Sequence, residues 1–231
     1  MADFNTHILG ATVVVSLGAT CCTKLLDLGM TDGLMLTVAG LVGGVLPDID
    51  LKQSQPSRFL FSLLGLIAAF AWLFANIPAY SGLELWLGAA FVYLLIRFPL
   101  WWLFHTVTVH RGILHSLIAA LMMGVLLSAV AWQFLNTNEL QSWLLGIFMT
   151  LGYLIHLTLD EIYSVDFSGV KVRRSFGSAL KPMDFDEIPA SCLVLFITGM
   201  AWFWTASYDT AWQQWQALYT DWRTALLPTW L

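Results

Sequence analysis

The chain has 231 residues, of which 58% are hydrophobic and only 11% are charged, and its mean hydropathy is +0.74. Because an ordinary soluble domain carries about 25% charged residues, this composition indicates an integral membrane protein and excludes a disordered chain. The formal net charge is −5 and there are ten Lys and Arg, too few and too scattered for a nucleic-acid-binding surface. Three cysteines in or beside apolar runs do not suggest a disulfide framework.

Apolar runs long enough to span a bilayer recur along the chain, without the alternation typical of membrane β-strands. The sequence therefore predicts an all-α, polytopic helical membrane protein with about seven transmembrane helices. In chain order they are expected at residues 6–26, 33–47, 58–77, 83–104, 113–135, 139–159 and 189–207. The second is short for a span, and the Gly43-Gly44 pair is expected inside it.

Two segments differ from these spans. Residues 161–187 are the main polar stretch, expected to form a small hairpin or an ordered loop in which Asp184 is solvated. In residues 208–231, Trp and Tyr recur every three or four positions among polar residues, which favours an amphipathic Trp-rich interfacial helix over packing against the bundle. The predicted organisation is one transmembrane domain over residues 1–207, followed by this helix.

The basic residues predict the orientation in the membrane. With a cytoplasmic N-terminus, the opposite side holds only Lys24 and Arg223. The cytoplasmic loops then hold most of the ten basic residues, namely Lys52, Arg58, Arg111, Lys171, Arg173, Arg174 and Lys181. The positive-inside rule thus predicts the N-terminus inside and the C-terminus outside. No cleaved signal peptide is expected, because no basic residue precedes the first apolar run.

Ionisable residues beside spanning segments are costly in hydrocarbon, and each is a candidate functional residue. His7 starts the first predicted helix, although an isolated histidine there is more often a capping or interfacial residue. Asp48 and Asp50 follow the second helix, where extended backbone would point both carboxylates the same way. Two like charges held so close favour a bound cation or a raised pKa.

Two further clusters contain the remaining candidates. His110 and His115 flank the entry to the fifth helix, with His110 expected in the loop and His115 in the first helical turn. His156 and Asp160 are four residues apart, so they share one face of the sixth helix. That pair fits half of a metal site and equally a structural His–Asp hydrogen bond.

All of these residues fall at helix ends on the predicted cytoplasmic side, whereas unrelated core histidines would be scattered over both ends. Because a first-row metal ion takes about four to six donors, this many ligands favours a site for two ions. Mixed imidazole and carboxylate ligands suit Zn²⁺ or Mn²⁺, and no thiolate lies in the clusters. The predicted ligands are His7, Asp48, Asp50, His110, His115, His156 and Asp160.

The order of these motifs closely resembles the YdjM family, over about residues 5 to 165. The motifs are His7, Leu46-Pro47-Asp48-Ile49-Asp50, His110-Arg111-Gly112 with His115-Ser116, and Gly152-Tyr153 with His156 and Asp160. The resemblance implies a LexA-regulated, metal-dependent hydrolase of the bacterial inner membrane, related in pattern to zinc-dependent phospholipase C and P1 nuclease. It also implies a ligand role for the same residues. Leu51, Leu114 and the Glu161-Ile162-Tyr163-Ser164 segment depart from the family pattern.

These patterns lead to a functional hypothesis. The protein is expected to hydrolyse a phosphoester, most simply of a membrane lipid, with a metal-activated water at the cytoplasmic face. Arg111 is a candidate for binding the substrate phosphate, and Glu161 is a candidate general base or additional ligand. The alternatives are a metal-ion or solute transporter and a non-catalytic protein that a metal stabilises. No nucleic-acid partner is expected, and no motif specifies an oligomeric state.

Overall fold

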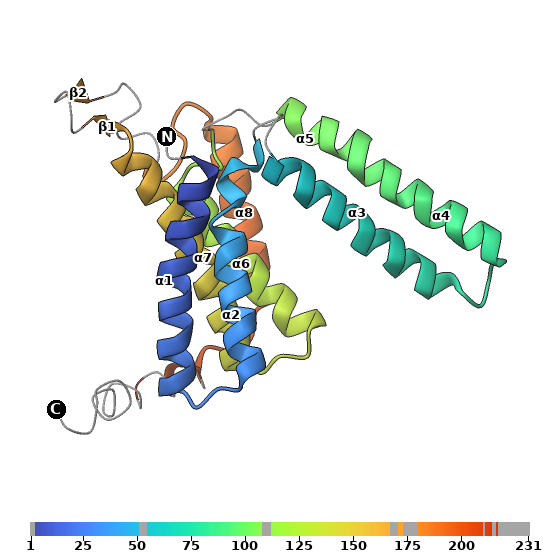
Figure 1. Ribbon diagram of the computed structural model, residues 1–231, viewed down its shortest axis with the longest axis horizontal. Helices are drawn as coiled ribbons and strands as arrows, with labels where there is room; N and C mark the ends of the chain where they lie inside the picture. Colours follow the sequence, from blue (N-terminus) through green and yellow to red (C-terminus); the bar gives the residue numbers. More distant parts are fainter. Residues whose placement is uncertain are drawn as a thin grey trace. The chain divides into compact units, whose positions relative to one another are not determined.

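The computed structural model describes residues 3–50, 55–107, 112–166, 171–172, 180–209, 211–213 and 216. The fold is all-α, as predicted, and the chain forms two compact units (Figure 1). The larger unit comprises Met1–Pro47 and Ile113–Leu231, and the smaller unit comprises Asp48–Gly112. The prediction of one domain over residues 1–207 remains a prediction.

The larger unit is a helical bundle. Its helices are α1 (Phe4–Leu25), α2 (Met30–Gly43), α6 (Leu117–Phe134), α7 (Glu139–Ile162) and α8 (Ile188–Trp202). Helix α7 packs against α1, α2 and α6, and α8 packs on α6, so α7 is the central helix of the unit (Figure 1). One buried cluster joins Val15 of α1 and Leu36 of α2 to Leu144 and Phe148 of α7.

The smaller unit is a helical hairpin that begins within η1 (Leu46–Asp50), a 3₁₀-helix. Helix α3 (Gln55–Asn76) packs against α4 (Gly82–Leu95), which continues through a π-helical turn, η2 (Ile96–Leu100), into α5 (Trp101–Val107). Pro99 lies inside the π-helical turn. It removes a backbone donor, which is a common reason for a helix to change its hydrogen-bond pattern.

The predicted helices all appear, with adjusted ends. Among the described residues, five helices are long and apolar enough to cross a membrane, whereas α2 and α8 have 14 and 15 residues. The count of about seven spans therefore stays a prediction. The second helix was expected to reach residue 47, but it ends at Gly43 and the Gly43-Gly44 pair closes it rather than lying inside it. A 3₁₀-helix then follows, so the extended backbone expected at Asp48-Ile49-Asp50 is wrong.

The predicted polar segment contains a small hairpin, in which β1 (Val165–Asp166) pairs antiparallel with β2 (Lys171–Val172). The interfacial helix predicted over residues 208–231 lies almost entirely outside the described residues.

Glycines let α2 and α7 approach until their backbones touch. A Cβ on Gly152 would lie 1.8 Å from the Gly40 carbonyl oxygen, and one on Gly43 would lie 2.1 Å from the Met149 oxygen. Such separations are far inside van der Waals contact, so only glycine fits at these positions. Small residues at helix contacts are typical of membrane bundles, where close backbone packing replaces the hydrophobic effect.

We predict that Gly152→Ala destabilises the protein by about 1–3 kcal/mol or more, because the added methyl group would force α7 away from backbone that cannot rotate aside. Thermal unfolding in detergent would measure this change. Gly199→Ala in α8 is the matched control, since nothing lies within 4 Å of its added Cβ. The control is expected to be neutral or stabilising by up to about 1 kcal/mol. Equal melting temperatures for the two variants would contradict the close packing.

Candidate metal centre

Four buried side chains from three parts of the larger unit meet at one end of the bundle: His7 of α1, His115 just before α6, and His156 and Asp160 of α7. Asp160 is at the centre of the cluster. Its Oδ1 lies 3.3 Å from His7 Nε2, and its Oδ2 lies 3.7 Å from His115 Nε2 and 4.0 Å from His156 Nε2. Three imidazoles thus surround one carboxylate away from water.

The His7 and His156 rings stack on each other. Their centroids are 3.7 Å apart and their planes are inclined by 7°. Donor atoms of His7, His156 and Asp160 all lie within 4.8 Å of one another, a spacing at which one cation can contact all three. The His115 ring stands edge-on to that of His156, with centroids 5.9 Å apart.

His7 lies near the start of α1, where the helix cap fixes its position. Asp3 caps this helix and accepts a 2.9 Å hydrogen bond from the Thr6 amide, and Thr6 also donates its hydroxyl. These two bonds lower the pKa of Asp3, because they favour its charged form. His7, one turn into the helix, has both ring nitrogens buried without a well-formed hydrogen bond among the described residues. A buried polar atom in that state calls for a partner such as a water molecule or an ion.

A backbone carbonyl orients His156. Its Nδ1 lies 2.8 Å from the carbonyl oxygen of Gly44. Because a carbonyl can only accept, Nδ1 donates in this contact, which leaves Nε2 as the ring nitrogen that could bind a metal ion. Histidines that bind metals are commonly fixed in this way by an outer hydrogen bond. The donor set of three imidazoles and one carboxylate therefore fits a divalent metal ion.

The segment that carries His115 is held against α7 and is not helical. His115 was expected in the first helical turn, but α6 begins at Leu117. Ser116 has extended backbone, and its hydroxyl accepts a 3.3 Å hydrogen bond from the Ala119 amide, so it caps the helix one residue after His115. The Tyr153 hydroxyl donates to the Leu114 carbonyl at 2.5 Å and secures this segment to α7.

A second segment, at residues 181–182, supplies hydrogen-bond acceptors to the first amides of α6. The Leu117 and Ile118 amides donate to the carbonyls of Lys181 and Pro182, at 2.9 and 3.1 Å. These amides have no partner within a helix, so the 181–182 backbone satisfies them next to His115. Asp184 was expected to be solvated, but it is buried, and its carboxylate pairs with Lys181 at 2.9 Å. The Ser191 hydroxyl of α8 accepts a hydrogen bond from the Asp184 amide and donates one to the Asp184 carbonyl.

The other predicted site residues belong to the smaller unit, to the end of α7 or to positions outside the described residues. Asp48 is buried in η1, at the first residue of the smaller unit, and its ligand role stays a prediction. In a 3₁₀-helix, residues two apart are turned by roughly 240°, so the argument that paired Asp48 with Asp50 on extended backbone fails. The side chain of Asp50, and His110 and Arg111 entirely, lie outside the described residues.

Glu161 follows Asp160 in α7 and is partly exposed, turned about 100° from that buried carboxylate. Its role as a base or ligand stays a prediction. His105 is buried in the smaller unit, where its Nε2 lies 2.8 Å from the Ser57 hydroxyl. Trp101 also donates to that hydroxyl, at 3.1 Å.

Sequence reasoning missed the Gly44 carbonyl, the Asp184–Ser191 contact and the exact start of α6. The last of these had a readable signal, because serine is a favoured N-cap residue and Ser116 directly follows His115. The other two depend on residues distant in sequence and leave no local signal.

Comparison with known proteins places the chain in a family. A model of the YdjM inner membrane protein family matches residues 1–227. The chain belongs to the YdjM family. Comparisons with curated proteins and with solved structures gave no significant match. Membership in a membrane protein family and five helices able to cross a bilayer together support a membrane location.

We predict that Tyr153→Phe destabilises this YdjM family member by about 1–3 kcal/mol, because the Leu114 carbonyl would be left buried without its hydroxyl donor. Tyr163→Phe is the control, since Tyr163 is 49% exposed at the end of the same helix. Thermal unfolding of both variants in detergent would measure the difference. If Tyr153→Phe unfolds with the wild type, the hydroxyl does not hold the His115 segment.

Proposed function

We propose that this YdjM family member is a metal-dependent hydrolase that cleaves a phosphoester, in the simplest case of a membrane lipid, at the cytoplasmic face of the bacterial inner membrane. The observation that carries the proposal is the cluster of His7, His115, His156 and Asp160, buried around one carboxylate. Burying this many titratable groups costs free energy that a packed apolar core would not incur, so a bound ion is the natural compensation.

Each residue of the cluster has a distinct part in holding the ion. Asp160 would supply one negative charge, which offsets half of the charge of a divalent cation in an apolar bundle. His156 offers Nε2, since Gly44 holds the proton on Nδ1. His7 and His115 bring imidazoles from α1 and from the segment before α6, so the ion would join three parts of the fold. Zn²⁺ or Mn²⁺ suits this mixture of donors.

The catalytic part of the proposal uses the remaining motif residues. A bound divalent ion would supply Lewis acidity and nucleophilic water near neutral pH. Asp48, Asp50 and His110 are proposed to complete the donor set for a second ion. Arg111 would bind the substrate phosphate through two parallel N–H···O bonds, as guanidinium groups do. Glu161 would take a proton from the attacking water.

The position of the cluster along its helices supports the proposal of a lipid substrate. His7 lies one turn inside α1 and Asp160 two residues before the end of α7, and both helices are candidate spans. In a membrane, the cluster would therefore lie close to a boundary of the hydrocarbon core, near the depth of phospholipid phosphate esters. The positive-inside rule would put this boundary on the cytoplasmic side.

A second candidate function is a purely structural metal site. The four side chains are at most 1% exposed, and structural metal sites are closed in this way, whereas catalytic sites keep one position open. In that case the ion would tie α1, α6 and α7 together without turnover. The experiment below separates the two candidates.

We predict that elemental analysis of detergent-purified protein finds about one or two equivalents of a transition metal. His156→Ala and Asp160→Ala are expected to abolish most of this binding, because each removes a central donor. Asp48→Ala tests whether Asp48 belongs to the same site. His105→Gln is the matched control: it alters a buried histidine of the smaller unit, bonded to Ser57, and should leave the metal content unchanged.

The same samples are then assayed on phosphodiesters and phospholipids, with chelation and re-addition of Zn²⁺ or Mn²⁺. Hydrolysis that requires metal and disappears in the two alanine variants supports the hydrolase. Bound metal with no hydrolysis, and a melting temperature that falls on chelation, supports the structural site. A wild type that stays free of metal after incubation with both ions contradicts both functions.

A further inference from the structure

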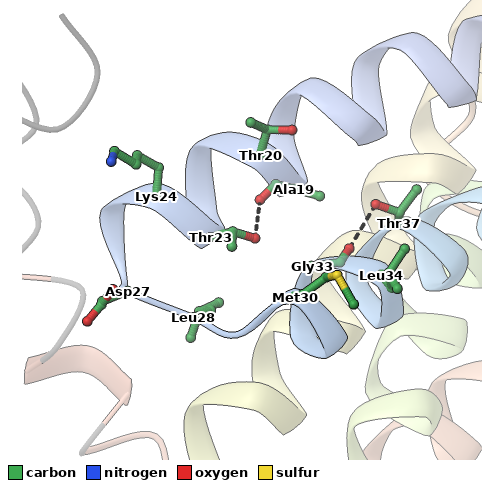
Figure 2. Close-up of a pocket in the computed structure, with 10 residues that line it drawn as sticks. All are labelled: Ala19, Thr20, Thr23, Lys24, Asp27, Leu28, Met30, Gly33, Leu34 and Thr37. Atoms are coloured by element: carbon green, nitrogen blue, oxygen red, sulfur yellow. Dashed lines mark hydrogen bonds between the residues drawn. The ribbon is translucent and has the colours of Figure 1, made fainter.

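A pocket of about 540 Å³ lies between the end of α1 and the start of α2 (Figure 2). It is separate from the metal centre, because its residue Lys24 is seventeen positions after His7 on one helix, or about 25 Å along the axis. Figure 2 shows Lys24 and Asp27 by the loop and Leu34 and Thr37 on α2. The lining is Ala19, Thr20, Thr23, Lys24, Asp27, Leu28, Met30, Gly33, Leu34 and Thr37.

Asp27 occupies a position where the backbone favours a different residue. Helix α1 ends in a Schellman motif, in which the Leu28 amide donates to the Thr23 carbonyl at 3.0 Å. The residue that turns the chain is Asp27, with φ of 49°, a conformation that glycine and asparagine adopt most readily. Its negative charge also stands at a helix C-terminus, where the dipole favours cations. Neither effect accounts for a carboxylate here.

The pocket thus carries a cation and an anion that are not paired with each other. Lys24 lies in the last turn of α1, three residues before Asp27, and no ion pair joins the two within the described part of the chain. Both charges are available to a ligand that has one group of each sign.

Hydroxyl groups on both helices add acceptors to the pocket. Thr23 and Thr37 donate their protons to the carbonyls of Ala19 and Gly33, at 2.7 and 2.8 Å. Because their protons are used within the helices, their oxygens face a ligand only as acceptors. A pocket lined by such acceptors and by a carboxylate suits a group with several N–H donors, such as a primary ammonium.

Apolar surface continues from the pocket along both helices. Met30 and Leu34 at the start of α2 are 80% and 58% exposed, and Leu17 of α1 is 64% exposed. Since α1 is a candidate span, this surface is suited to lipid acyl chains.

We propose that the pocket binds one phospholipid with a primary-amine headgroup. Lys24 would bind the phosphate, Asp27 and the threonine oxygens would bind the ammonium, and the acyl chains would lie along α1 and α2. An anionic headgroup without an amine would leave Asp27 unmatched. A quaternary ammonium has no N–H to donate. This site is independent of the proposed hydrolase function.

The test compares three lipids with identical acyl chains, phosphatidylethanolamine, phosphatidylglycerol and phosphatidylcholine, by native mass spectrometry of delipidated full-length protein in detergent. Wild type is expected to bind phosphatidylethanolamine about fivefold more tightly than the other two, the effect of about one charge contact at a membrane surface. Lys24→Gln should weaken the binding of all three about fivefold, because each has a phosphate.

Asp27→Asn is the decisive variant, because asparagine tolerates the same backbone and removes only the charge. It should unfold no earlier than wild type and lose the preference for phosphatidylethanolamine over phosphatidylglycerol. Asp209→Asn, at an exposed carboxylate elsewhere, is the control and should keep that preference. The proposal is overturned if wild type binds the three lipids equally, or if Asp27→Asn retains the preference.

Discussion

The contact between the backbones of α2 and α7 is the constraint on which the rest of the larger unit depends. Gly152 admits the Gly40 carbonyl, and Gly43 admits that of Met149, so the two helices approach more closely than side chains would allow. One turn beyond Gly152, this approach brings the Gly44 carbonyl within 2.8 Å of His156. A contact made for packing therefore also sets the tautomer of a candidate metal ligand.

A charged group in an apolar bundle imposes the second constraint. Asp160 is fully buried in a helix long enough to cross a membrane, and three imidazoles surround it. The histidines come from α1, from the segment before α6 and from α7 itself, so the free energy of burying the carboxylate depends on the whole bundle. Hydrogen bonds accordingly hold the segment that carries His115 on both sides of that residue. They come from the Tyr153 hydroxyl and from the backbone carbonyls of Lys181 and Pro182. A metal ion would turn this costly arrangement into a cross-link between the helices.

The two ends of α1 have different chemistry. At its start, Asp3 caps the helix and His7 enters the buried cluster. At its end, a Schellman motif built on Asp27 borders a pocket whose two opposite charges, Lys24 and Asp27, are not paired with each other. We propose a metal ion at the first end and a zwitterionic amphiphile at the second, and one apolar helix separates the two ends by about the thickness of a bilayer core. Changes at one site can thus be tested without disturbing the other.

Local patterns in the sequence determined the all-α membrane fold, the approximate place of each helix and the pairing of His156 with Asp160, because hydropathy and helical period act over short stretches. They also singled out His7 and His115 by residue type. Only the tertiary structure decided that these two meet Asp160, that the Gly44 carbonyl orients His156, and that Asp184 is buried rather than solvated. His156 and Gly44 are 112 residues apart, and no local sequence pattern predicts a contact over that separation. Local reasoning failed at two places. Asp48 lies in a 3₁₀-helix rather than in extended backbone, and His115 precedes the helix because Ser116 is its N-cap.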